Sequence, residues 1–107
     1  MTYNSKLIVT SYKNPDLDGV ACMFAYTEFL YKQGKNVIPV ISGKPHIEAK
    51  FVLDKFNISN FTNIENIAED INEVILVDTS DLRTLSEYIS PNQVIEIIDH
   101  RITDELN

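Results

Sequence analysis

The chain has 107 residues, a length that suits one domain built around one hydrophobic core. Hydrophobic residues make up 44% of it and charged residues 23%, a balance that excludes wholesale disorder, collagen and coiled coil. Its 16 acidic and 9 basic residues give a net charge of −7, which argues against duplex nucleic acid or an anionic membrane surface as a partner.

The first half of the chain alternates strand and helix signals. A short β-branched run predicts a strand over Lys6–Thr10, and apolar residues three and four apart then predict a helix over 17–33 that stops at Gly34. The next apolar run predicts a strand over 37–41. Because Pro39 has no backbone N–H, we expect this strand to be irregular or to lie at an edge of the sheet.

The second half continues the alternation. Apolar spacing predicts helices over 47–56 and 82–89, with a shorter helical turn over 64–68. Two further β-branched runs, 74–77 and Val94–Ile98, predict strands, and each of them is followed by an aspartate.

Each of the first two helices should turn one apolar side to the sheet. In the first helix that side comprises Val20, Met23, Phe24, Thr27, Leu30 and Tyr31. In the second it comprises Ile47, Phe51 and Val52. Strands alternating with helices predict an α/β fold, a parallel sheet with helices on both faces and right-handed connections.

Polar clusters follow three of the predicted strands: residues 14–19 (NPDLDG), 78–81 (DTSD) and 99–101 (DHR). The carboxyl ends of parallel strands meet at one edge of a sheet, where ligands collect. We therefore expect five side chains to approach one another there: Asp16, Asp18, Asp78, Asp99 and His100. Carboxylates this close repel, so a cation is the natural compensation, and oxygen ligands with one imidazole favour Mn²⁺ or Mg²⁺ over zinc.

Several of these polar residues also have a purely structural explanation. Asp18 could be the N-cap of the first helix, and Asp81 could cap a later one. His46 follows Pro45 at a predicted helix start, so we expect an exposed helix-terminal residue rather than a ligand. Three acidic clusters that all follow strands are harder to explain by capping alone.

The same segments carry a resemblance to a known family. Residues 14–18 (NPDLD), 77–81 (VDTSD) and 97–100 (IIDH) resemble, in order and spacing, motifs I, II and III of the DHH phosphoesterase superfamily. That superfamily includes manganese-dependent inorganic pyrophosphatases, exopolyphosphatases, oligoribonucleases and cyclic-dinucleotide phosphodiesterases. The resemblance implies a Rossmann-like DHH domain over residues 1–107, forming the N-terminal part of a longer architecture.

The resemblance also implies a role for each motif residue. Asp16 would belong to one metal site, Asp18 to the other, and Asp78 would bridge both. His100 would bind the second metal, and Asp99 would orient the His100 ring. In such a pair of Mn²⁺ or Mg²⁺ ions, a shared water becomes a nucleophilic hydroxide that attacks a phosphoryl group in line. Asp78 and His100 are then the catalytic residues of a hydrolase acting on pyrophosphate, polyphosphate or a short oligonucleotide.

Some features depart from the superfamily's motifs. Tyr12 stands where motif I usually opens with a histidine, and Arg101 replaces the second histidine of motif III. Arg101 could hold a substrate phosphate through its planar guanidinium, or pair with carboxylates such as Asp104 or Glu105. The motif IV aspartate and the C-terminal substrate-binding domain have no counterpart before Asn107. These departures leave open a second function, a catalytically silent metal- or nucleotide-binding module on the same fold.

A different phosphatase class is a further alternative. Residues 16–20 (DLDGV) resemble the DxDG[TV] motif of haloacid-dehalogenase-like phosphatases, in which the first aspartate is a covalent nucleophile. There the strand runs almost directly into that aspartate, whereas residues 11–15 intervene here and Pro15 forces an extended turn. The DHH resemblance therefore explains the segment better.

The single cysteine, Cys22, excludes a disulfide within the chain and fits a reducing compartment. It stands among apolar residues, so we expect a buried and inert thiol. No apolar run reaches the ~18 residues of a membrane span, and the first residues do not form a signal peptide. We therefore expect a cytoplasmic protein without a membrane partner, and the sequence leaves open whether copies of the chain associate.

Overall fold

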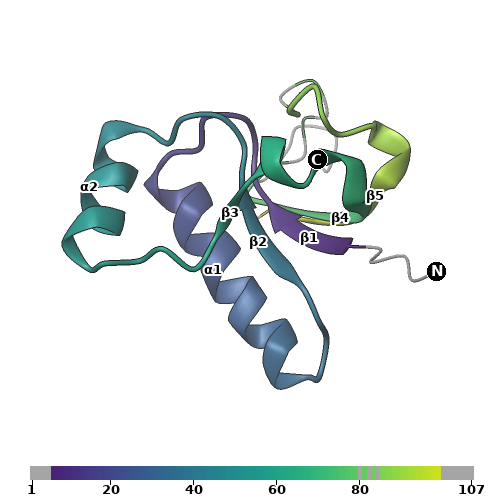
Figure 1. Ribbon diagram of the computed structural model, residues 1–107, viewed down its shortest axis with the longest axis horizontal. Helices are drawn as coiled ribbons and strands as arrows, with labels where there is room; N and C mark the ends of the chain where they lie inside the picture. Colours follow the sequence, from purple (N-terminus) through teal and green to yellow (C-terminus); the bar gives the residue numbers. More distant parts are fainter. Residues whose placement is uncertain (1–5, 80, 82, 84, 100–107) are drawn as a thin grey trace, which may run out of the picture.

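A computed structural model describes residues 6–79, 81, 83 and 85–99. Five parallel strands form one sheet in the order β3-β2-β1-β4-β5 (Figure 1). The strands are β1 (Lys6–Thr10), β2 (Ile38–Ile41), β3 (Thr62–Asn63), β4 (Ile71–Val77) and β5 (Val94–Ile98). The α-helices are α1 (Leu17–Lys32) and α2 (Ile47–Lys55), and the 3₁₀ helices are η1 (Ile64–Asn66), η2 (Ala68–Asp70) and η4 (Pro91–Gln93). The predicted α/β fold with a parallel sheet is thereby confirmed.

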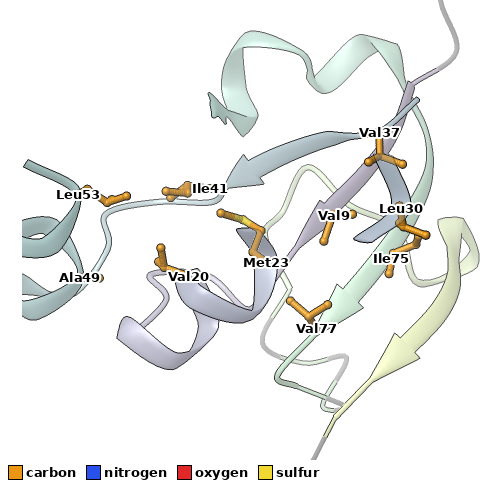
Figure 2. Packing of buried hydrophobic residues seen from close by; sticks show 10 residues of the cluster. All are labelled: Val9, Val20, Met23, Leu30, Val37, Ile41, Ala49, Leu53, Ile75 and Val77. Carbon is orange, nitrogen blue, oxygen red and sulfur yellow. The ribbon is translucent and has the colours of Figure 1, made fainter. Parts of the chain in front are cut away.

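Both α-helices lie on the same side of the sheet, with α1 directly against the strands and α2 against α1. Figure 2 shows the cluster between them, in which side chains of α1 and α2 meet alternate residues of the strands. Its ten buried members are Val9, Val20, Met23, Leu30, Val37, Ile41, Ala49, Leu53, Ile75 and Val77. Alternate side chains of a strand point to opposite faces, so the other half of the strand residues forms a second core.

The second core lies on the opposite face and is covered by short segments. Ile8, Val40, Ile71, Val74 and Leu76 come from the strands, and Ile64 and Ile89 pack with them. Helices were predicted on both faces of the sheet. In the structure the α-helices lie on one face, and the 3₁₀ helix η1 contributes the buried Ile64 on the other.

Pro39 marks a difference from the expected topology. The strand that carries it is not at an edge of the sheet, because β2 lies between β1 and the two-residue β3, which the sequence pattern did not reveal. β3 pairs only with Val40 and Ile41, so Pro39 has a neighbouring strand on one side, at Val9. The missing N–H is tolerated for that reason.

Two predicted helices differ from those in the structure. In α2 the buried residues are Ala49 and Leu53, whereas Ile47 is 84% and Phe51 63% exposed, so the predicted apolar side was wrong. The described residues of the segment 82–89 form no α-helix; they include a turn, and Ile89 N donates to Ser86 O at 3.0 Å. In α1 the predicted side is confirmed at Val20, Met23, Thr27 and Leu30, although Tyr31 is exposed.

The length and hydropathy of the helices show whether any of them could span a membrane. Within the described ranges, no helix has both the length and the apolar character needed to cross a bilayer.

Candidate metal centre at the carboxyl edge of the sheet

Asp16 is fixed by the start of α1. It is the N-cap of that helix, and its Oδ1 accepts a hydrogen bond from Gly19 N at 2.8 Å. Its own backbone N donates to the Tyr12 hydroxyl at 3.1 Å. The Gly19 amide lowers the pKa of the Asp16 carboxyl below its ordinary value, and the interaction of that carboxyl with the Tyr12 side chain and the charge of His46 lower it further. The carboxylate is therefore held in its charged form, as a metal ligand requires.

Asp18 is the second residue of the same helix. It is exposed in the first turn of α1, where a negative charge meets the positive end of the helix dipole. Capping is performed by Asp16 instead, so the structural explanation suggested for Asp18 was wrong.

The close approach of α1 to β1 depends on Gly19. A Cβ at this position would lie 2.8 Å from Ser11 Oγ and 3.3 Å from the Pro15 side chain. Ser11 and Ser42, at the ends of β1 and β2, are the buried serines whose hydroxyls have no hydrogen-bond partner among the residues that the structure describes. Small residues thus let the two loops and the helix start crowd together at this edge.

Asp78 is the most constrained of the acidic residues. It follows β4 directly, is 6% exposed, and adopts the left-handed backbone conformation with φ 60°. Its backbone N donates to Ile98 O at 2.8 Å, which ties the end of β4 to the end of β5. A non-glycine residue with positive φ costs free energy, and such residues cluster at functional sites.

The electrostatics of Tyr12 and Cys22 show how the acidic residues are grouped. Burial raises the pKa of the Tyr12 hydroxyl, and the carboxylates of Asp16 and Asp78 add to the rise. Burial also raises the pKa of the Cys22 thiol, and four carboxylates contribute further: Asp78, Asp18, Asp16 and Asp99. The charges of the four predicted acidic site residues therefore all affect the same thiol, in the N-terminal half of α1. Cys22 itself is half-buried rather than fully buried, and its raised pKa keeps it in the unreactive thiol form.

A shallow apolar pocket of about 290 Å³ adjoins Asp78. It is lined by Cys22, Ala25, Tyr26, Val77, Asp78 and Ile98. A larger groove of about 490 Å³ runs beside α1 and α2 and contains none of the predicted site residues. Of these two pockets, the smaller one is therefore the one that adjoins a predicted site residue.

No complete metal site is formed by the described residues alone. Among them there is no group of three or more acidic, histidine or cysteine side chains placed to hold one ion. His100 and Arg101, the predicted imidazole ligand and phosphate-binding residue, lie outside the described residues. The donors that are described are carboxylates, and their oxygens are the ligand type that Mn²⁺ and Mg²⁺ prefer. The donor set therefore fits the predicted metal in kind, and the ligand assignment stays a prediction.

His46 has the structural role expected of it, whereas Asp81 does not cap an α-helix, because the described residues that follow it form none. His46 is the exposed N-cap residue of α2. Asp81 Oδ1 accepts from Arg83 N at 3.0 Å, and its carboxylate forms an ion pair with the same arginine.

Sequence reasoning missed one contribution to the site, the loop that follows β2. Residues 42–46 form hydrogen bonds with residues 14–15, immediately before Asp16. The available signal was Gly43, because glycine is favoured where a loop needs a positive φ.

Comparison with known proteins decides the family. The model of the DHH family, N-terminal domain, matches residues 6–107. The chain belongs to the DHH family. This membership replaces the haloacid-dehalogenase-like alternative and agrees with the parallel sheet and with the acidic residues at its carboxyl edge.

DHH-family relatives are similar over most of the chain. A probable manganese-dependent inorganic pyrophosphatase of Brevibacillus brevis is 37% identical over 95 residues, which cover 89% of this chain and 31% of that protein. Proteins with the same name from Oceanobacillus iheyensis and Bacillus mycoides are 39% and 35% identical, with 30% and 31% of their lengths covered. The chain thus spans about a third of the length of these relatives.

Proposed function

We propose that this DHH domain carries metal-binding carboxylates of a Mn²⁺-dependent hydrolase that cleaves phosphoanhydride bonds, with pyrophosphate as the first substrate to test. The observation that carries the proposal is Asp78, buried and held in a left-handed conformation at the carboxyl end of β4. The relatives named as probable manganese-dependent inorganic pyrophosphatases support the choice of metal and substrate.

The predicted site residues would have different roles in metal and substrate binding. Asp16, Asp18 and Asp78 would hold the ions together with His100, and Asp99 would orient the imidazole of His100. Divalent ions bound there would supply a nucleophilic water and neutralise charge on the phosphoryl group. Arg101 would hold a phosphate oxygen.

The helix cap and the backbone bond of Asp78 would prepare the carboxylates for this role. Asp16 is oriented by Gly19 N and Tyr12, and Asp78 is fixed through Ile98 O. A carboxylate has lone pairs for more than one partner, so Asp16 can accept the capping bond and still bind an ion. Pre-oriented ligands lose less conformational entropy when an ion binds.

Phosphate release from pyrophosphate in the presence of Mn²⁺ tests the proposal, with polyphosphate and short oligonucleotides as alternative substrates. We expect Asp78→Asn to lower the rate by at least about 100-fold, because the variant loses a carboxylate shared by the two ions. Asp81→Asn is the matched control: it removes a charge from the same loop, where the carboxylate pairs with Arg83. Hydrolysis that survives Asp78→Asn would contradict the mechanism.

One observation favours the alternative of a catalytically silent module. The Tyr12 hydroxyl lies beside Asp16, and its raised pKa keeps it a neutral phenol, which is a weak metal ligand. Mn²⁺ binding without hydrolysis of any of the three substrates would favour the silent metal-binding module over the hydrolase.

A further inference from the structure

The loops that follow β1 and β2 are joined by three backbone-directed hydrogen bonds. Asn14 N donates to Ser42 O, Lys44 N donates to the side-chain Oδ1 of Asn14, and His46 N donates to Pro15 O, each at 2.8 Å. We call this set of three bonds the loop clamp. Because β1 and β2 are adjacent parallel strands, their following loops emerge side by side, which makes the clamp possible.

The loop clamp requires an unusual backbone conformation in both loops. Asn14 adopts a left-handed conformation with φ 58°, and Gly43 has φ +76°. A Cβ on Gly43 would overlap Asn14 Oδ1, the atom that accepts the bond from Lys44 N. A larger residue at 43 would therefore be strained in its backbone and would push away the acceptor.

The loop clamp ends next to Asp16. Pro15 is fully buried, its ring restricts φ, and its carbonyl is held by His46 N. The chain then passes directly to Asp16, whose N is bound to Tyr12 and whose carboxylate is bound to Gly19. A displacement of the loop clamp would therefore also displace Asp16.

We propose that Asn14 is a positioning residue for Asp16: through the loop clamp, the β2–α2 loop holds this carboxylate in the orientation that binds Mn²⁺. The proposal rests on the proposed function, because it takes Asp16 to be a metal ligand. It also makes the coupling reciprocal, so an ion bound at Asp16 must stabilise the loop around Lys44, about thirty residues away in the sequence.

The first experiment measures Mn²⁺ binding by titration calorimetry for Asn14→Gly. Glycine accepts the left-handed backbone but removes the Oδ1 acceptor, so the variant isolates the bond to Lys44 N. Asn57→Gly is the matched control, because Asn57 also has a left-handed φ of 54° and lies just beyond the end of α2. We expect Asn14→Gly to raise the Kd for Mn²⁺ by about 10-fold to 100-fold, and Asn57→Gly to leave it unchanged.

Two further variants separate positioning from folding. Asn14→Asp keeps an acceptor oxygen and should restore the wild-type Kd to within a few fold, whereas Gly43→Ala should weaken Mn²⁺ binding as Asn14→Gly does. Gly34→Ala is the control for the strain alone, because Gly34 has φ +83° and nothing within 4 Å of its would-be Cβ. A purely structural role would lower the melting temperature of the metal-free variants without changing Kd.

Hydrogen exchange of the Lys44 amide reports the loop clamp itself. Addition of Mn²⁺ to the wild-type chain should slow this exchange, and the effect should be lost in Asn14→Gly. An unchanged Kd in Asn14→Gly, with Mn²⁺ binding intact in the wild type, would overturn the clamp proposal and leave the proposed function standing. A wild-type chain that binds no Mn²⁺ would overturn both.

Discussion

Asp16 serves both the fold and the candidate site. Its carboxylate caps α1 through Gly19 N, and the same group is a predicted metal ligand. Asp78 also has a structural role beside its predicted role as a metal ligand. It follows β4 in a left-handed conformation, and its backbone N donates to Ile98 O of β5. Since the backbone around both residues is fixed, the fold restrains two of the predicted metal ligands.

The capping role of Asp16 predicts a pH dependence of stability. The Gly19 amide favours the charged carboxylate, so the pKa of Asp16 is lower in the folded than in the unfolded chain. Its stabilising contribution is therefore present above the unfolded value of about 3.9 and is lost as the pH falls through the lower folded value. In urea unfolding without metal, the wild type should exceed Asp16→Asn in stability by about 0.5–1 kcal/mol at pH 6.

This difference should shrink towards zero below pH 4, because the neutral asparagine still caps the helix but does not titrate. A difference that stays constant between pH 6 and pH 3 would show that the Asp16 charge does not contribute to the cap.

The loop clamp could not be predicted from local sequence patterns. Residues 14–18 stand in a recognisable motif, so Asp16, Asp18 and Asp78 could be proposed as ligands. The contact between Asn14 and the loop at Gly43 joins segments far apart in the sequence, and no local pattern encodes it. The left-handed φ of Asn14 is only weakly signalled, because asparagine merely tolerates that conformation more readily than most residues.

At the scale of the elements, helix α1 was predicted well and α2 only in its extent. The apolar residues of α1 lie on one consistent side along the helix, and Gly34, with φ +83°, follows its C-cap. In α2, Ile47 and Phe51 have the same i, i+4 spacing as Ala49 and Leu53, so periodicity cannot decide which pair faces the sheet. The structure buries the pair that contains the small Ala49, which lets the helix approach closely.

The segment 82–89 illustrates a different limit. Its apolar spacing matches a helix, but Ser86 makes local hydrogen bonds: its Oγ accepts from Tyr88 N at 3.2 Å and its carbonyl from Ile89 N. Serine bonds of this kind compete with helical ones, and Ser90 and Pro91 then begin η4. Ile89 is still buried, so the apolar pattern located a core residue and misjudged its secondary structure.

The packing of α1 predicts unequal effects along that helix. Met23 is 1% exposed and belongs to the core cluster that joins α1, α2 and the strands, whereas Tyr31 is 54% exposed. Met23→Ala should lower the free energy of unfolding by about 2–5 kcal/mol through lost burial and a cavity. Tyr31→Ala should change it by about 0.5 kcal/mol or less. Equal losses in denaturant unfolding would contradict the assignment of the buried side.

At the scale of the whole molecule, part of the acidic excess lies near the carboxyl edge of the sheet. The net charge is −7, and four carboxylates act together on Cys22 at the start of α1. Like charges gathered in this way oppose folding, and a divalent cation would relieve the repulsion. The charge that argues against nucleic acid is therefore compatible with a phosphate substrate when metal ions intervene.

Metal binding should consequently stabilise the chain. At a Mn²⁺ concentration 100 times Kd, linkage adds about 2.7 kcal/mol, which corresponds to a rise of about 10–20 °C in melting temperature for a domain of this size. Removal of Mn²⁺ with a chelator should reverse the rise, and Asp78→Ala should abolish most of it. A rise of the same size in Asp78→Ala would indicate general screening of the negative charge instead of a specific site.

The central claim is that the carboxyl edge of the sheet binds the metal ions. Crystals of the chain grown with Mn²⁺, measured at the manganese absorption edge, test it most directly. The account predicts anomalous density between Asp16, Asp18 and Asp78, with the imidazole of His100 as a further ligand. Ordered Mn²⁺ found only elsewhere on the molecule, or no anomalous density at this edge, would contradict it.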